Sequence, residues 1–300
     1  MKRQSGLDGS PFPFRLTARE LAVKMRCRHN ASRYPVPVIS IAENVGATVE
    51  YAQILSDGSL GRTEGGYIIK VNETLHPYRQ RFTIAHELGH IVFEREAQES
   101  SSIRRCSTGT FNNRKEEEQF CNYFAACLLL PDNAIAEFTE WKAISIQKLM
   151  VKAHELEVSV DALVWRVLEQ TPYEGGTLWF RMMGKPTNPK DIKLRLDWGV
   201  FPKTERMYLP RYDAVPKRSP IHQALASPHE KLYHNVEVDF GSLRGRRTLL
   251  VKAIGQRVLA IVFPEEVNPS TVLSDGSNFP QSRIDIAIDE FGENQDGNGV

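Results

Sequence analysis

Residues 81–94 read RFTIAHELGHIVFE, and this stretch decides what the rest of the chain can be. His86 and His90 stand four residues apart, so on a helix both imidazoles point to the same side and can bind one metal ion. Glu87 lies between them in sequence, where it can act as a general base toward a water that the ion activates. Apolar residues flank all three, so their side chains are expected to be largely buried. Burial of histidine and glutamate costs free energy unless the side chains have hydrogen-bond partners or bind a metal. The spacing predicts a helix over 78–97 that carries a zinc site, with one Zn²⁺ per chain.

The next predicted helix, residues 114–130 with the sequence RKEEEQFCNYFAACLLL, offers three glutamates for the third protein ligand that a catalytic zinc needs. Its apolar stripe borders both Glu117 and Glu118 and leaves Glu116 pointing away, so periodicity alone does not choose between the first two. Asn122 follows Glu118 by one turn. This ExxxN pair predicts that Glu118 binds the metal and that Asn122 supports a histidine ligand through a hydrogen bond.

These segments resemble the ImmA/IrrE metallopeptidases of bacteria and phages. The resemblance covers roughly residues 30–170 and rests on HELGH, on the later ExxxNYFAACLLLP, and on the flanking stretches VISIAENVGATVEY, GGYIIKVN and VSVDALVWRVL. It implies a zincin-like peptidase in which His86, His90 and Glu118 bind zinc and Glu87 is catalytic. It also implies that the substrate is a helix-turn-helix transcriptional repressor. Cleavage of that repressor would switch on stress, damage-response or antiphage defence genes.

The four cysteines show no CxxC spacing, which argues against a four-thiolate zinc site and is typical of a reducing compartment. The first residues lack the apolar core of a signal peptide, and no apolar run approaches the length of a membrane span. We therefore expect a cytoplasmic protein without a membrane partner. Cys106 lies in a polar loop between the two ligand helices, beside two arginines that favour its thiolate. It is a candidate inhibitory fourth zinc ligand; the alternative is an exposed cysteine of no consequence.

In the first half, TVEYAQI at 48–54 and GGYIIKVN at 65–72 are predicted to be strands, and strand-like patterns dominate the second half. Strands are predicted at 177–183, 192–198 and 283–289, and a hairpin over 248–263 turns at Gly255-Gln256. This region is similar in kind to the GAF-like sensor region of IrrE-type and CapP-type members of the family. We thus predict an α+β protein in which a zincin-like metallopeptidase domain with a helical hairpin precedes a β-rich GAF/PAS-like sensor domain. The predicted parts are a disordered N-terminus at 1–13, the peptidase domain at 14–141, a helix-turn-helix-like hairpin at 142–170, a linker at 171–176, the sensor domain at 177–290 and a disordered acidic tail at 291–300.

The net charge of +1 excludes a globally basic nucleic-acid coat, but it hides a local imbalance. Residues 181–257 contain 16 Lys and Arg against 7 Asp and Glu, with aromatic residues interleaved. This pattern suits single-stranded DNA as an activator; the alternatives are a solvated β domain and a pocket for a small anionic ligand. The candidate nucleic-acid patch comprises Arg181, Lys193, Arg195, Lys203, Arg206, Arg211, Arg244, Arg246 and Arg247.

The sequence therefore predicts a site-specific zinc endopeptidase that acts on a repressor. Two other classes stay open: a DNA-binding regulator whose zinc site is structural or inert, and a metallohydrolase that acts on a small amide. The hairpin near 157–159 does not favour DNA recognition, because its second helix carries one arginine against two acids and is otherwise apolar.

Overall fold

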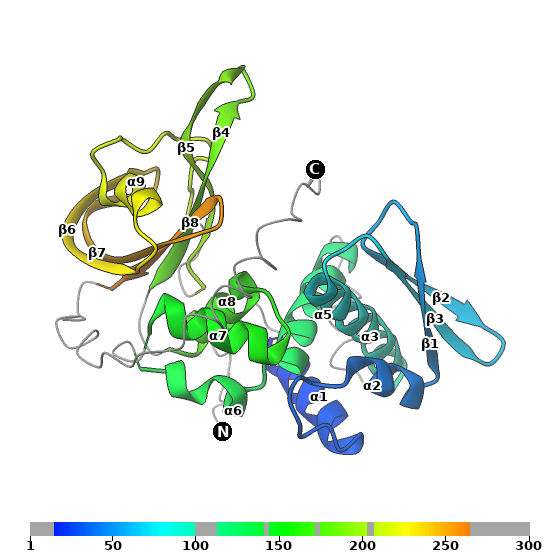
Figure 1. The fold of residues 1–300 in the computed structure, drawn as a ribbon. Helices are drawn as coiled ribbons and strands as arrows, with labels where there is room; N and C mark the ends of the chain where they lie inside the picture. Colours follow the sequence, from blue (N-terminus) through cyan, green and yellow to red (C-terminus); the bar gives the residue numbers. More distant parts are fainter. Residues whose placement is uncertain (1–14, 100–112, 141–143, 172–174, 203–206, 265–300) are drawn as a thin grey trace, which may run out of the picture. The chain divides into compact units, whose positions relative to one another are not determined.

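The computed structural model describes residues 15–99, 113–140, 144–171, 175–202 and 207–264 (Figure 1). Contacts divide the chain into two compact units. The first consists of Met1–Asp132 with Glu155–Val158, and the second of Asn133–His154 with Ser159–Val300. Across the described parts of the chain, no helix combines the length and the apolar character that crossing a membrane requires.

The first unit contains a sheet of three strands in the order β1-β3-β2. The strand β1 (Ala47–Ala52) runs parallel to β3 (Gly66–Asn72), and β2 (Gly58–Thr63) pairs antiparallel to β3 on the other side. Ile69 and Val71 in the central strand are fully buried. This order leaves β2 at one edge of the sheet.

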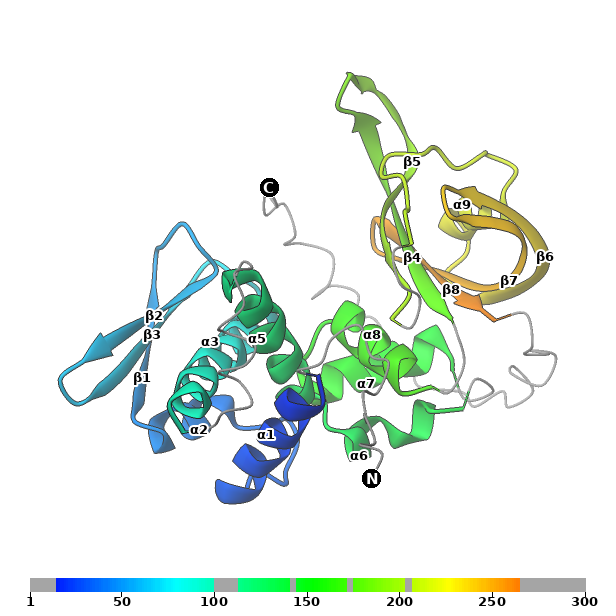
Figure 2. The ribbon, with the colours of Figure 1, turned by 180° about the vertical axis from the view of Figure 1, so that it is seen from behind.

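Among its described residues, the first unit also contains the helices α1 (Arg15–Arg28), α2 (Val38–Asn44), α3 (Pro77–Glu99) and α5 (Asn113–Leu129). The helices α3 and α5 lie side by side in both views (Figures 1 and 2). They occupy the two segments for which the sequence predicts the metal-binding helices, within a few residues at each end. The two helices with zinc-ligand candidates therefore form the centre of this unit.

The N-terminal part of α3 is tied to the turn at Glu155–Val158, which belongs to the same unit. Arg81 Nη1 lies 3.1 Å from Glu157 Oε2, and Arg81 Nη2 donates to the carbonyl of Val36 at 2.8 Å. Glu157 has a φ of +52°, so the backbone turns sharply there. Burial lowers the pKa of the Arg81 guanidinium, and the Glu157 carboxylate opposes that shift.

The second unit combines short and long helices with a sheet of five strands. The sheet order is β5-β4-β8-β7-β6, and every neighbouring pair is antiparallel. The elements among its described residues are α6 (Asp132–Ile135, which begins one residue before the unit), η1 (Ala136–Phe138), α7 (Ile146–Leu156, whose last two residues belong to the first unit), α8 (Val160–Gln170), β4 (Gly176–Lys185), β5 (Asn188–Val200), α9 (Pro220–Gln223), η3 (Ala224–Ala226), β6 (Lys231–Phe240), β7 (Leu243–Ile254) and β8 (Arg257–Phe263).

Both faces of this sheet are covered. The strands β6 and β7 curve around α9 in both views (Figures 1 and 2), and Ile221 of that helix is buried in the core of this side with strand residues such as Phe180. On the other side α8 packs against β4, where Trp179 is 2% exposed. Ser159 caps α8 by accepting a hydrogen bond from the backbone N–H of Ala162, which stabilises the first turn.

Mixed α and β structure is confirmed, as is the hairpin that turns at Gly255-Gln256. Two strands, β2 and β6, were not predicted. The identification of the curled sheet as GAF-like or PAS-like stays a prediction, and so does the finer division into domains. Three further predictions lie wholly outside the described residues: the strand at 283–289 and the disordered ends at 1–13 and 291–300. Half of the proposed linker, residues 172–174, lies outside them as well.

Candidate metal centre

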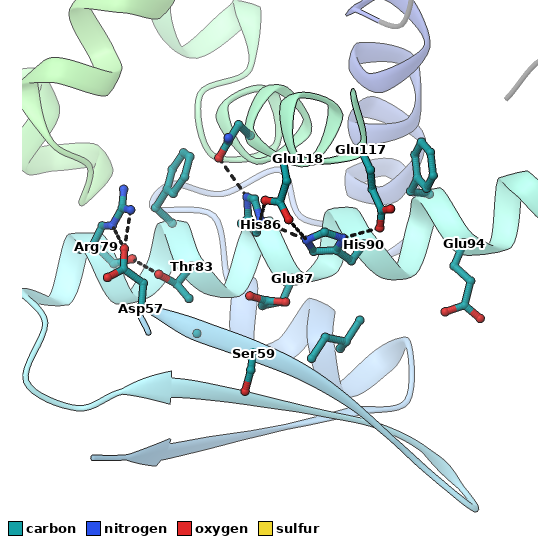
Figure 3. Close-up of a pocket in the computed structure, with 15 residues that line it drawn as sticks. Asp57, Ser59, Arg79, Thr83, His86, Glu87, His90, Glu94, Glu117 and Glu118 are labelled. Carbon is teal, nitrogen blue, oxygen red and sulfur yellow. Dashed lines mark hydrogen bonds and ion pairs between the residues drawn. The ribbon is translucent and has the colours of Figure 1, made fainter. Parts of the chain in front are cut away.

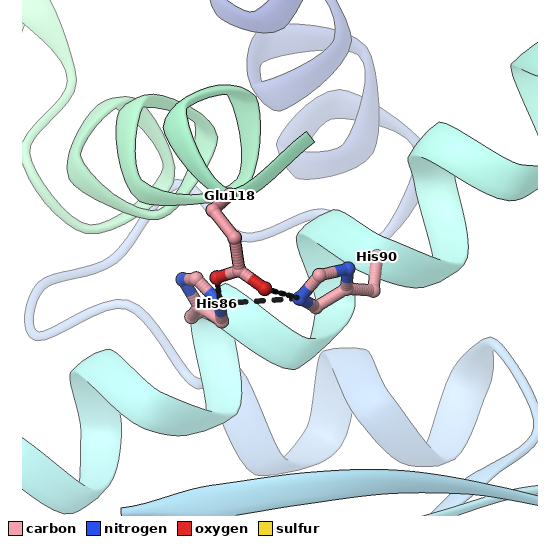
Figure 4. Close-up of side chains that lie close together, drawn as sticks. All are labelled: His86, His90 and Glu118. Atoms are coloured by element: carbon pink, nitrogen blue, oxygen red, sulfur yellow. Dashed lines mark hydrogen bonds and ion pairs between the residues drawn. The ribbon is translucent and has the colours of Figure 1, made fainter. Parts of the chain in front are cut away.

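The helix α3 carries His86 and His90 one turn apart, and both rings point toward α5 (Figure 4). Their Nε2 atoms lie 3.2 Å from each other. Glu118 of α5 reaches the same point: its Oε2 lies 3.3 Å from His86 Nε2, and its Oε1 lies 3.8 Å from His90 Nε2. Among the described residues these three form a group that could hold a metal ion, with donor atoms within 4.8 Å of one another.

The separations can be compared with what zinc requires. Donors that each lie about 2.0–2.2 Å from one ion at tetrahedral angles are roughly 3.3–3.6 Å from one another. The distances of 3.2 Å between the two Nε2 atoms and 3.3 Å from His86 Nε2 to Glu118 Oε2 are close to these values. The other carboxylate oxygen, Oε1, lies 3.8 Å from His90 Nε2, which is slightly longer. Two imidazoles and one carboxylate are also a donor set that zinc binds in catalytic sites. The residues present therefore fit a zinc ion.

Close packing of the two helices brings Glu118 to the histidines. Gly89 lies opposite Cys121, and a Cβ added to Gly89 would stand 2.9 Å from Cys121 Cα. That distance is shorter than ordinary side-chain contacts, so the absence of a side chain on Gly89 permits the approach. Cys121 itself is fully buried, and burial raises the pKa of its thiol, so we assign it a packing role.

The outer nitrogens of both rings also have partners. His86 Nδ1 lies 3.0 Å from Asn122 Oδ1, so the hydrogen bond predicted for Asn122 is present. His90 Nδ1 lies 2.8 Å from Glu117 Oε1. Periodicity alone did not separate Glu117 from Glu118, because both border the apolar stripe of one helix, and the choice of Glu118 depended on its spacing from Asn122. The structure places Glu118 at the two Nε2 atoms and Glu117 behind the second histidine.

Burial shifts the titration of two groups in the site. It lowers the pKa of His86, and the neighbouring His90 acts in the same direction. Burial raises the pKa of Glu87, which is 7% exposed, while His90 opposes that shift. The lowered pKa favours the neutral imidazole of His86, which metal binding needs. The raised pKa gives the Glu87 carboxylate a greater affinity for a proton.

These side chains open into a pocket of about 970 Å³, lined by α3, α5 and β2 (Figure 3). Glu87 lies between α3 and β2, and a Cβ added to Gly58 would come within 3.2 Å of Glu87 Oε1. Ion pairs occur at both ends of the pocket. Arg79 donates to Asp57 at 2.8 Å, and Glu94 pairs with an arginine of β2. The strand that sequence analysis missed therefore forms one wall of the site.

One member of the candidate nucleic-acid patch is buried, which corrects our prediction for it. Arg195 is 1% exposed and donates to the carbonyls of Met183 at 2.9 Å and Tyr212 at 3.2 Å. It also donates to the carboxylate of Asp191 at 3.0 Å. Its guanidinium serves these internal acceptors, so Arg195 is not part of an accessible patch.

The other described members of the patch lie nearer the surface, and acidic partners stand close to most of them. Arg181 and Arg211 both contact Asp197, at 3.2 and 3.0 Å. Lys193 pairs with Asp191 of its own strand, β5. Two cross-strand pairs join β6 and β7, Arg244 with Asp239 and Arg246 with Glu237, while Arg247 donates to the carbonyl of Arg246. Lys203, Arg206 and Cys106 lie outside the described residues. The local positive charge is thus partly balanced, and the DNA and Cys106 hypotheses stay predictions.

Comparison with known proteins gives a family match over part of the chain. Residues 42–168 match the model of the IrrE N-terminal-like domain, Peptidase_M78. The radiation response metalloprotease IrrE of Deinococcus radiodurans is 34% identical over 120 residues, which cover 38% of this chain and 36% of that protein. The protein of the same name from Deinococcus deserti is 29% identical over 119 residues, which cover 37% of this chain and 41% of that protein. The chain therefore spans about four tenths of the length of these relatives.

Among solved structures, a Mycobacterium tuberculosis transcriptional regulator aligns with 85% of this chain and 82% of its own. The sequence identity is 15% and the TM-score is 0.46.

Proposed function

We propose, from the premise that this chain belongs to the ImmA/IrrE family through residues 42–168, that it is a zinc-dependent endopeptidase. One observation carries the proposal: His86, His90 and Glu118 converge at the floor of an open pocket that also contains Glu87. A structural zinc site is usually closed by four protein ligands, whereas a catalytic site keeps a position open. Within the described residues three donors converge here, which supports a catalytic site.

Each residue has a task in peptide hydrolysis. His86, His90 and Glu118 would hold the ion, which when bound supplies Lewis-acid chemistry, polarising a carbonyl group and lowering the pKa of water. Glu87 would accept a proton from the attacking water and return it to the leaving amine. The raised pKa of Glu87 supports this exchange, because a carboxylate with greater affinity for a proton is a stronger base toward the attacking water.

The position of β2 at the edge of the sheet favours a peptide as the substrate. It pairs with β3 on one side, and residues Gly58 to Leu60 line the pocket. An extended peptide could add to such an edge through backbone hydrogen bonds, which would carry its scissile bond past Glu87. We therefore propose that the substrate is cleaved within an extended or locally unfolded segment.

For the substrate we propose a helix-turn-helix repressor, on the resemblance described above. The name of the Deinococcus relatives, radiation response metalloprotease, supports a role in a stress response. Control of antiphage defence genes is the second role that we propose. Single-stranded DNA is the proposed activator. Arg244 and Arg246, each with a side chain 73% exposed, are the most exposed of the described members of the candidate patch. The alternative is a DNA-binding regulator with an inert zinc site.

The test mixes the purified protein with the repressor encoded beside its gene, with and without single-stranded DNA. We expect one specific cut in the repressor that a chelator abolishes. Glu87→Gln should keep zinc and slow cleavage by about 10²- to 10⁴-fold. Glu116→Gln, an acid on α5 that does not line the pocket, is the matched control and should cleave like the wild type. Repressor that stays intact under every condition, while DNA still binds, would favour the regulator.

A further inference from the structure

The two histidines of the candidate centre differ in what holds their outer nitrogens. His86 Nδ1 faces the side-chain amide of Asn122 at 3.0 Å, whereas His90 Nδ1 faces the carboxylate of Glu117 at 2.8 Å. Both inner Nε2 atoms face Glu118. Glu117 thus touches the site from behind one ligand and does not belong to the group of converging donors.

This difference matters for the tautomer of each ring. A neutral imidazole has one protonated nitrogen and one free lone pair, so Nε2 can bind a metal only when Nδ1 carries the proton. An amide offers both an oxygen acceptor and an NH₂ donor, so Asn122 can pair with either tautomer by rotating. An ionised carboxylate only accepts. Glu117 therefore favours the tautomer of His90 in which Nε2 is free.

We infer that Glu117 is a positioning residue that holds His90 in its metal-binding orientation and tautomer. The inference rests on the proposed function, because it concerns how the same site holds zinc. Glu117 is suited to this task by its place on α5, directly before Glu118, so that one turn of helix supplies both the third donor and the support for the second histidine. Its side chain is 34% exposed, which leaves the carboxylate partly screened but still paired with the ring.

The same contact separates this role from that of a ligand. Glu117 Oε1 lies at hydrogen-bond distance from His90 Nδ1, on the side of the ring that faces away from His86 and Glu118 (Figure 3). A carboxylate in that place cannot share an ion with Nε2 of the same ring. Loss of the Glu117 side chain should therefore weaken zinc binding without removing a ligand. Removal of a hydrogen-bond partner behind a metal ligand typically costs about 10- to 100-fold in affinity.

The experiment measures Zn²⁺ affinity by competition with a chromophoric chelator for the full-length chain and four variants. We expect Glu117→Ala to bind Zn²⁺ about 10- to 100-fold more weakly than the wild type. Glu117→Gln should recover part of the loss, because its amide oxygen can still accept from Nδ1. Glu118→Ala should lose tight binding, and Glu116→Ala should match the wild type.

Two further measurements distinguish positioning from a general structural effect. Metal-free Glu117→Ala should unfold at the same temperature as the metal-free wild type. Its Co²⁺ complex should keep the intensity of a site with the same number of ligands, while its absorption bands shift because His90 is oriented differently. Failure of the wild type to bind Zn²⁺ would defeat the proposed function. Wild-type affinity in Glu117→Ala would defeat this inference alone, and a loss as complete as that of Glu118→Ala would make Glu117 a ligand.

Discussion

Replacing Gly89 by alanine tests whether the spacing of α3 and α5 builds the metal site. The new Cβ would stand 2.9 Å from Cys121 Cα, 3.1 Å from Cys121 Cβ and 3.3 Å from the Cys121 carbonyl oxygen. Ordinary carbon contacts lie at about 3.5–4.0 Å, so the helices must separate by roughly 0.6–1 Å. The nearest atoms belong to the backbone, and a side-chain rotation cannot relieve the clash.

Two effects of opposite sign act on stability. Alanine favours the helix over glycine by about 1 kcal/mol, and overpacking costs about 1–3 kcal/mol. We therefore expect a net loss of about 1 kcal/mol in the free energy of unfolding of the metal-free protein. Zinc binding should suffer more, because ligand distances must hold to about ±0.2 Å. A shift of α5 moves Glu118 away from both histidines, so we expect the Zn²⁺ affinity to fall by about tenfold or more.

The assay combines chelator competition for Zn²⁺ with urea unfolding of the metal-free protein. Gly61→Ala is the matched control, since its Cβ would meet only the Ile68 carbonyl oxygen at an ordinary 3.8 Å. Adding Cys121→Ala to the Gly89 variant should not restore affinity, because the Cys121 Cα that causes the clash remains. Wild-type Zn²⁺ affinity in Gly89→Ala would refute the reasoning, as would rescue by Cys121→Ala.

Three more outcomes follow from the structure. Burial raises the pKa of Glu87, so the folded metal-free protein holds a proton there more strongly than the unfolded chain does. The wild type should therefore lose stability relative to Glu87→Gln as pH rises from about 4.3 through the raised pKa. If urea unfolding between pH 4 and 8 shows a constant difference in unfolding free energy between the two proteins, this prediction is wrong. Zn²⁺ at a hundred times its Kd should stabilise the folded protein by about 2.7 kcal/mol, and an excess of chelator should reverse this gain. Equal melting temperatures with and without Zn²⁺ would argue against a metal site in the folded protein. Arg195→Met should lower the free energy of unfolding by about 1–3 kcal/mol, because internal carbonyls lose their hydrogen-bond donor. Arg244→Ala removes one member of an exposed ion pair and should change the free energy of unfolding little. Denaturant unfolding that showed the larger loss in Arg244→Ala would contradict the internal role of Arg195.

The metal centre could be foreseen from spacing because its parts are local. His86 and His90 are fixed by one helical turn, and Asn122 marks the face of the second helix that meets the first. Glu117 was different: its contact depends on where α3 lies relative to α5, and that distance is set by Gly89 across the interface. No property of a single helix contains that information.

Strand β2 could not be foreseen because its sequence, GSLGRT, lacks the run of β-branched and aromatic residues that favours strands. Pairing with β3 supplies its hydrogen bonds instead. The surroundings of the basic residues could not be foreseen for a related reason. Counting charges gives a local excess, but it does not show that Arg195 is buried among carbonyls or that Arg244 faces Asp239.

The contact between Arg81 and Glu157 has a practical consequence for anyone who wants the first unit by itself. The unit is discontinuous in sequence: it ends at Asp132 and resumes for four residues at Glu155–Val158. A fragment cut after residue 132 would leave the partly buried Arg81 without its carboxylate partner, five residues before His86. A fragment cut after 158 would keep the partner but end before α8 begins. The unit that carries the candidate metal centre is therefore best expressed, purified and assayed as part of the whole chain.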